Sequence, residues 1–123
     1  MIKVQELEFN KEYWYSYIEF SRNSTRVNKR VSPKKVVYEP IKDTDDYYKS
    51  RGVVGFIKSL TGQHIYNVLS GSKVFEYIYK TEEEAIEGFN TILYSELDKI
   101  KYEYELKQKM INKNFILNKN EGD

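Results

Sequence analysis

A run of cationic side chains with no acid among them is the feature of this sequence best suited to chemistry. From residue 22 to residue 35 the chain carries lysine and arginine but no aspartate or glutamate, and the next acid is Glu39. Several cations that point the same way can bind phosphate groups without a strict register. The cations of this run are Arg22, Arg26, Lys29, Arg30, Lys34 and Lys35.

Alternation along a strand puts Arg26 and Arg30 on one face of this segment. Tyrosines at 13, 15 and 17 precede it, and Tyr13, Tyr15 and Tyr17 could offer rings on which bases stack. The sequence therefore predicts a nucleic-acid interface. Two alternatives stay open: a solvated edge strand whose charges block sheet-to-sheet aggregation, or a patch that docks on an acidic protein. A net charge of only +1 weakens the nucleic-acid interpretation.

The other candidate sites are weaker. Asp43, Asp45 and Asp46 could hold a hard cation, but they lack the glycine and distal glutamate of a calcium loop and could instead pair with the cationic run. His64 has no assigned partner for acid–base chemistry. The chain has no cysteine, which excludes disulfides, thiolate zinc sites and cysteine nucleophiles. We therefore expect a non-enzymatic binding protein without a metal or cofactor.

The elements that must position these residues are mostly strands. Aromatic and β-branched residues at period two predict about six antiparallel strands between residues 2 and 79, forming a curved sheet or a small barrel. Residues 32–34, "SPK", are expected to form a turn, and "SGSK" is expected to join two strands as a hairpin around Gly71. The fold class is α+β, with one domain over residues 1–114 and a flexible tail over 115–123.

A long helix is expected over residues 82–111, beginning at a capping box of Thr81 and Glu84. Its apolar residues recur at helical spacing and form a face that covers the sheet. About thirty residues span roughly 45 Å, more than a domain of this size can cover. A second apolar row of Tyr102, Leu106 and Met110 therefore predicts a homodimer contact, unless the N-terminal strand or the tail segment "FIL" covers it.

The composition also suggests an origin. A small chain without cysteine that is rich in lysine, asparagine and tyrosine resembles the accessory and early proteins of tailed phages. That resemblance implies a phage-encoded protein that binds nucleic acid or inhibits a host protein in the host cytoplasm. The early residues "MIKVQELEFNKEYW" carry acids where a signal peptide would be apolar, and no apolar run reaches the ~20 residues of a membrane helix. We therefore expect a cytoplasmic protein that does not contact a membrane.

Overall fold

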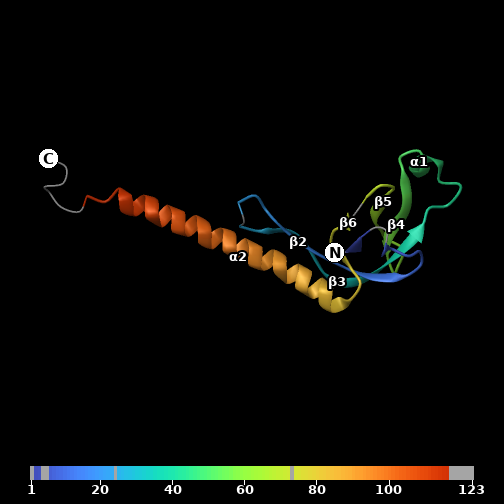
Figure 1. Cartoon of the computed structure of the whole chain (residues 1–123), viewed down its shortest axis with the longest axis horizontal. Coiled ribbons are helices and arrows are strands. Elements are labelled where there is room, and N and C mark those ends of the chain that lie inside the picture. The colour runs from blue at the N-terminus through green and yellow to red at the C-terminus, as the bar shows by residue number, and fades with distance from the viewer. Residues whose placement is uncertain (1, 4–5, 24, 73, 117–123) are drawn as a thin grey trace. The chain divides into compact units, whose positions relative to one another are not determined.

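The computed structural model describes residues 2–3, 6–23, 25–72 and 74–116. The chain forms two compact units, Met1–Asn90 and Thr91–Asp123. Helix α2 (Glu82–Lys113) begins in the first unit and continues through the second (Figure 1). The strands described all lie in the first unit, so the predicted α+β class is confirmed.

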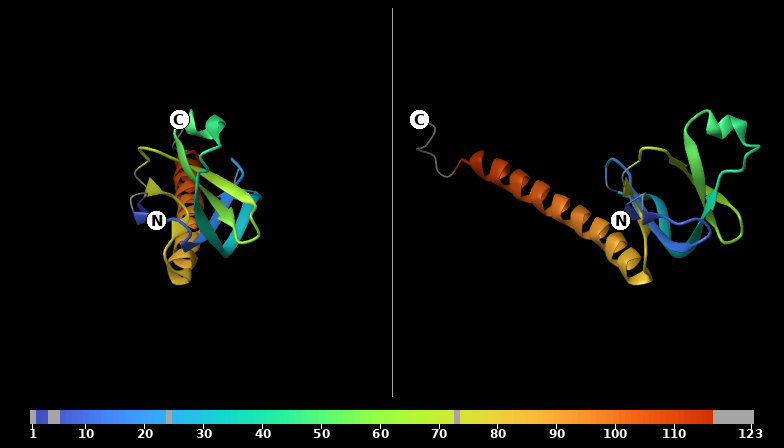
Figure 2. Two further views of the ribbon diagram at one scale, coloured as in Figure 1. Left: turned by 90° about the vertical axis from the view of Figure 1, so that its right-hand side faces the viewer. Right: turned by 45° about the vertical axis from the view of Figure 1, so that its right-hand side comes forward.

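The main sheet of the first unit has five strands and is antiparallel throughout. Its strand order is β5-β4-β3-β2-β7, and its two outer strands remain edges, so the sheet does not close into a barrel (Figure 2). A separate pair joins β1 (Ile2–Lys3) to β6 (Val74–Phe75). The five strands are β2 (Glu12–Phe20), β3 (Val27–Pro40), β4 (Val53–Ser59), β5 (His64–Leu69) and β7 (Ile78–Tyr79).

One face of this sheet carries the core, and the core is rich in tyrosine. Aromatic rings bury large areas, and a buried hydroxyl needs a hydrogen-bond partner. The phenol oxygens of Tyr15 and Tyr66 lie 3.1 Å apart and form one such bond. The buried cluster consists of Ile2, Tyr13, Tyr15, Val36, Tyr38, Ile57, Val68 and Ile78.

The first turns of α2 contact the other face of β2. The hydroxyl of buried Ser16 donates a 2.7 Å hydrogen bond to the carbonyl oxygen of Ala85, and Ala85 and Phe89 are themselves buried. Gly88 allows this close approach, because a Cβ there would overlap the hydroxyl of Tyr79. Ile86 recurs at helical spacing with Phe89 and belongs to the apolar face that the sequence was expected to bury, but it is exposed. The helix therefore presents a slightly different face to the sheet than its apolar pattern predicted.

The predicted helix start is confirmed. The backbone N–H of Glu84 donates to the side-chain oxygen of Thr81 at 3.2 Å, which is the capping bond that the sequence indicated. The helix ends at Lys113, two residues beyond the expected end. No helix among the described residues has both the length and the apolar character needed to cross a membrane. Most of the predicted tail, residues 117–123, lies outside the described residues.

Two strand predictions are wrong. The segment 32–34 is not a turn but lies inside β3, where the register against β2 shifts. Pro33 is tolerated there because β4 pairs only with Val36–Pro40, so the proline removes no hydrogen bond to a second neighbour. The predicted hairpin at Gly71 also fails: β5 pairs with β4, whereas β6 pairs with β1. Tyr77, with a positive φ of 69°, separates β6 from β7.

Candidate nucleic-acid interface

The two halves of β3 differ in how many strands they contact. β4 pairs with β3 only over residues 36–40, and β7 pairs with β2 only at Trp14 and Tyr15. Residues 16–20 and 27–34 therefore form a two-stranded antiparallel ribbon, and residues 21–23 and 25–26 are the described residues between its two strands (Figure 1). We call residues 16–34 the cationic ribbon. Among the described residues no third strand pairs with the edge of β3 over residues 27–34, and most side chains of this stretch are exposed.

Charge is strongly concentrated in the cationic ribbon. It carries five cations and one carboxylate, so its net charge is +4, whereas the whole chain has +1. Among the described residues, none of these five cations forms an ion pair. Lys35, just beyond the ribbon, pairs with Glu12 at 3.5 Å. The near-neutral total therefore conceals a local excess of positive charge that can act on an anionic partner.

The closed end of the ribbon is held in a defined shape. The side-chain oxygen of Asn23 accepts hydrogen bonds from the hydroxyls of Ser21 and Thr25 at 2.6 and 2.7 Å. The backbone N–H of Ser21 donates to the carbonyl oxygen of Arg26 at 2.9 Å. These side chains, together with Arg22 and Asn28, line an open polar hollow of about 520 Å³. Arg22 and Arg26 thus bring two guanidinium groups to one hollow.

The remaining cations are divided between the two faces of the ribbon. In the strand register Lys29 lies opposite Glu19 and Lys34 lies opposite Tyr15. Both lysines are therefore on the face of the sheet that carries the core. Their ammonium groups lie 5.8 Å from the ring of Tyr17 and 5.9 Å from the ring of Tyr15, respectively.

Arg30 occupies the opposite face. In the strand register it lies opposite Ile18. Its guanidinium group lies 5.2 Å from the centre of the Phe89 ring and donates a 2.6 Å hydrogen bond to the hydroxyl of Ser32. That Arg26 and Arg30 share one face stays a prediction, because no regular strand pairing among the described residues connects the two. Arg26 lies before the first residue of β3, and the register shifts between Glu19 and Phe20. The cations surround the ribbon instead of lining one side of it.

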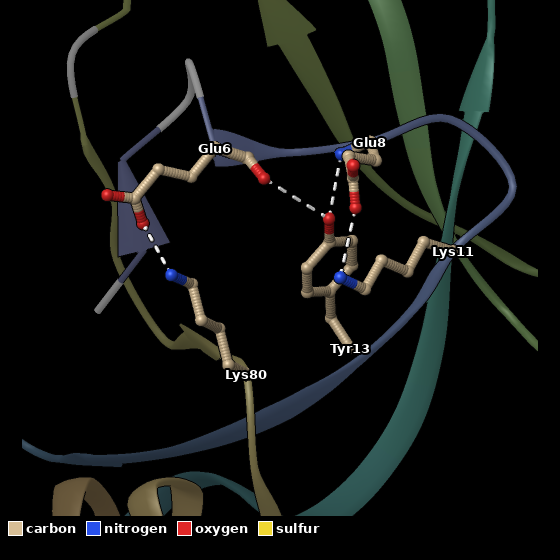
Figure 3. Close-up of polar contacts among 5 residues, drawn as sticks. All are labelled: Glu6, Glu8, Lys11, Tyr13 and Lys80. Carbon is tan, nitrogen blue, oxygen red and sulfur yellow. Dashed lines mark hydrogen bonds and ion pairs between the residues drawn. The ribbon is translucent and has the colours of Figure 1, made fainter.

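Two of the three tyrosines predicted to stack on bases are in the core. Tyr13 and Tyr15 are each only 1% exposed, so the prediction that they present ring faces to a ligand is wrong. The Tyr13 hydroxyl accepts a hydrogen bond from the N–H of Glu8 at 2.7 Å and lies 3.4 Å from the carbonyl oxygen of Glu6, to which it donates (Figure 3). The carboxylates of these two glutamates also form ion pairs, Glu8 with Lys11 and Glu6 with Lys80.

Tyr17 remains partly exposed. Its ring lies 4.4 Å from that of Tyr77, and the two rings are tilted against each other. Burial is the main cause that raises the pKa of Tyr17, and the charge of the nearby Glu19 raises it further. Burial and the hydrogen bond to Tyr15 raise the pKa of Tyr66, and the charge of Lys29 offsets part of that rise. The phenols at the base of the ribbon are thus neutral at ordinary pH and do not oppose its positive charge.

The acidic loop pairs with its own neighbours. Asp43 forms an ion pair with Lys49 of the short helix α1 (Asp46–Lys49) at 3.3 Å, and the side chain of Asp45 accepts from the N–H of Lys42 at 3.4 Å. Within the described ranges, this loop forms no ion pair with the cationic ribbon, and no three histidine or acidic side chains converge as metal ligands.

His64 has contacts that the sequence did not reveal. Its Nε2 lies 2.7 Å from the side-chain oxygen of Asn67, and its ring packs 5.3 Å from Phe56. It lines a hollow of about 370 Å³ that includes an ion pair of 2.9 Å between Lys58 and Glu39. The register of β4 against β5 sets Lys58 opposite His64, and only knowledge of that pairing would have located the hollow.

The helix row predicted as an oligomer contact lies in the second unit. Tyr102, Leu106 and Met110 are all exposed. Of the segments expected to cover them, Ile2 belongs to the core of the first unit, whereas Phe115 and Ile116 are exposed. Leu117 lies outside the described residues. A homodimer through this row remains a prediction.

Comparison with known proteins gives no further guide to function. Neither a protein-family model nor a curated protein nor a solved structure matches this chain. The geometry and charge of the cationic ribbon are therefore the guide to function.

Proposed function

We propose that this protein is a non-enzymatic DNA-binding protein that inserts the cationic ribbon into a groove of duplex DNA and contacts the phosphates on both sides. The observation that carries this proposal is the distribution of charge: five cations, none ion-paired among the described residues, surround a two-stranded ribbon on both faces and at its closed end. A flat binding surface would use only one of those faces.

The dimensions of the major groove suit such an element. The major groove of B-form DNA is about 12 Å wide and admits a two-stranded β-ribbon. Phosphates line both walls of the groove, so Lys29 and Lys34 on one face and Arg30 on the other can each meet a backbone. Arg22 and Arg26 would reach furthest along the duplex, because they flank the hollow at the closed end.

Duplex DNA explains the geometry better than other nucleic acids do. Single-strand binding depends on aromatic rings that stack with bases, and Tyr13 and Tyr15 are buried. Duplex RNA has a deep, narrow major groove that protein elements do not enter readily. Contacts to phosphates carry no sequence information, so we expect binding with little sequence preference.

The direct test is fluorescence anisotropy with a short labelled DNA duplex at low salt. The double variant Arg22→Ala/Arg26→Ala should weaken binding at least about tenfold, because two phosphate contacts are lost. Lys109→Ala/Lys113→Ala is the matched control, because it removes the same charge from the second unit. We expect it to change the affinity by less than about twofold.

Three results would contradict the proposal. They are no duplex binding at low salt, equal losses in the two double variants, or single-stranded DNA binding more tightly than the duplex. Without DNA binding, the same cations would be better explained by docking on an acidic protein.

A further inference from the structure

The second unit carries an apolar seam whose spacing differs from that of a simple amphipathic helix. Leu93, Leu97, Ile100, Tyr104, Lys107 and Ile111 follow one another at alternating steps of four and three residues. That average of 3.5 residues per turn is the heptad repeat of a coiled coil. Leu93, Ile100 and Lys107 take the d positions of the repeat, and Leu97, Tyr104 and Ile111 take the a positions.

From Leu97 onward the apolar residues of this seam are exposed, whereas Leu93 is partly buried. Leu97 is 61% exposed, Ile100 51%, Tyr104 66% and Ile111 49%. Exposed apolar side chains in a continuous row mark an interaction surface. A heptad seam is most simply covered by another helix with the same spacing.

The surface of the helix already has the shape that a coiled-coil partner needs. Tyr104, Lys107, Gln108 and Ile111 line a hollow of about 300 Å³ on this helix. In the heptad repeat Tyr104 is an a residue, Lys107 a d residue, Gln108 an e residue and Ile111 the a residue of the next repeat. In a parallel dimer, a set of four such residues forms the hole that receives a d side chain of the partner helix.

In a parallel dimer of two copies in register, the side chain that enters this hollow is Lys107 of the second copy. The aliphatic stem of a lysine can occupy an apolar hollow while its ammonium group stays in water. A lysine on the seam therefore weakens the dimer without preventing it, and a polar core residue of this kind fixes the register.

Charge complementarity selects the partner and its direction. Glu96 takes a g position and Lys101 the following e position. In a parallel pair, the g residue of one helix meets the next e residue of the other, so Glu96 of each copy would lie beside Lys101 of the second copy. In an antiparallel pair along the same seam, g residues face g residues, so Glu96 would lie near Met110 of the second copy and the two copies of Glu103 would repel each other. Glu96 also contacts Lys99 of its own helix at 3.5 Å, and a carboxylate can accept from both lysines.

We propose that the second unit docks on a second copy of this chain as a parallel, in-register, two-stranded coiled coil along Leu93, Leu97, Ile100, Tyr104, Lys107 and Ile111. The proposal does not depend on DNA binding. The dimer is expected to be weak and concentration-dependent, because the seam has fewer than three full heptads and carries a lysine.

Sedimentation equilibrium on the full chain tests the assembly. The mass should rise with concentration from the 14.7 kDa of one chain toward twice that value. Ile100→Glu should raise the dimer dissociation constant more than about 100-fold, because it buries an unpaired charge. Tyr102→Glu is the matched control on another face, and it should shift the constant by less than about threefold. Lys107→Leu should lower the constant about tenfold or more.

The direction of the helices can be tested separately, because the chain has no cysteine. Leu97→Cys should form a disulfide-linked dimer under mild oxidation, since a parallel pair brings the two copies of position 97 together. Tyr102→Cys, at an outward f position, should not. In an antiparallel pair with the same seam, position 97 of one copy would face position 107 of the other, so the two copies of position 97 would lie about 15 Å apart along the axis.

Several outcomes would overturn the proposal. A mass of one chain at every concentration, including for Lys107→Leu, would exclude a coiled coil. Dissociation by Tyr102→Glu but not by Ile100→Glu would assign the contact to the row of Tyr102, Leu106 and Met110. Failure of Leu97→Cys to cross-link while the dimer persists would exclude the parallel arrangement. Circular dichroism on each variant confirms that the helix remains folded.

Discussion

The two halves of β3 belong to one strand but have different neighbours. Over residues 36–40 the strand lies between β2 and β4, and Val36 and Tyr38 are buried. Over residues 27–34 it pairs with β2 alone and carries Lys29, Arg30 and Lys34, all exposed. The number of neighbouring strands, more than the residue pattern, separates the half that stabilises the fold from the half that is free to bind.

This contrast has a physical basis. A strand with neighbours on both sides satisfies its backbone groups and buries one set of side chains, so a change there affects the free energy of folding. A strand with one neighbour keeps its long cationic side chains in water, where substitutions cost little stability. Each half should therefore respond to mutation in its own assay: unfolding for residues 36–40 and ligand binding for residues 27–34.

The largest effect is expected for Tyr38→Ala. The ring of Tyr38 packs against Phe9 at 4.8 Å and lies so close to Gly55 that a Cβ there would overlap it. Truncation leaves a cavity, and the free energy of unfolding should fall by about 3–5 kcal/mol. Chemical denaturation followed by circular dichroism measures this change. A loss below about 1 kcal/mol would show that this half is not the stabilising one.

Ser16→Ala should have the next largest effect. Ser16 lies where the covered part of β2 meets the ribbon, and its hydroxyl bonds to the carbonyl oxygen of Ala85. Removing the hydroxyl leaves that buried carbonyl without this donor, so the free energy of unfolding should fall by about 1–3 kcal/mol. Ser16→Thr keeps the donor but adds a methyl group, and it separates loss of the bond from crowding. An unchanged denaturation midpoint for Ser16→Ala would refute the role of this contact.

Alkaline pH should weaken the part of the fold that buries tyrosines. Burial raises the pKa values of Tyr38, Tyr66 and Tyr79. A raised folded-state pKa stabilises the protein below the unfolded value of about 10, and this stabilisation is lost as the pH rises above that value. The free energy of unfolding should therefore decrease as the pH rises above about 10. Denaturation midpoints across this range, compared with those of Tyr66→Phe, would reveal a shallower decrease in the variant.

The smallest effect on stability is expected for Lys34→Ala in the ribbon. Its ammonium group is exposed and has no ion pair among the described residues, so the unfolding free energy should change by less than about 0.5 kcal/mol. Affinity for duplex DNA should nevertheless fall several-fold, because one phosphate contact is lost. If Lys34→Ala lowers the free energy of unfolding as much as it lowers the free energy of DNA binding, or more, the distinction between the two halves of β3 does not hold.

The sequence predicted the elements better than their partners. The start of α2 could be read from Thr81 and Glu84, because capping depends on residues close in the chain. A glycine inside a strand often marks such an irregularity, and the register of β4 against β5 does shift between Val53 and Gly55. The strand through Pro33 was missed because a proline is acceptable where no second strand needs its N–H, and the sequence does not show where β4 ends.

Predictions of faces failed for a related reason. Strict alternation along 26–30 assumed a regular ladder, which the register shift between Glu19 and Phe20 interrupts. The positions of the cations could be predicted, and alternation also puts the neighbours Lys29 and Arg30 on opposite faces, as observed, but the shift in register could not be predicted. The burial of Tyr13 and Tyr15 likewise depends on which side of β2 faces the core, and an aromatic strand sequence leaves both choices open.

The salt dependence of DNA binding tests the central claim most directly. If four to five ribbon cations contact phosphates, the logarithm of the association constant should fall against the logarithm of salt concentration with a slope of about −4, and Arg22→Ala/Arg26→Ala should make that slope less negative by about 2. A slope near zero, or one that this double variant leaves unchanged, would contradict the account.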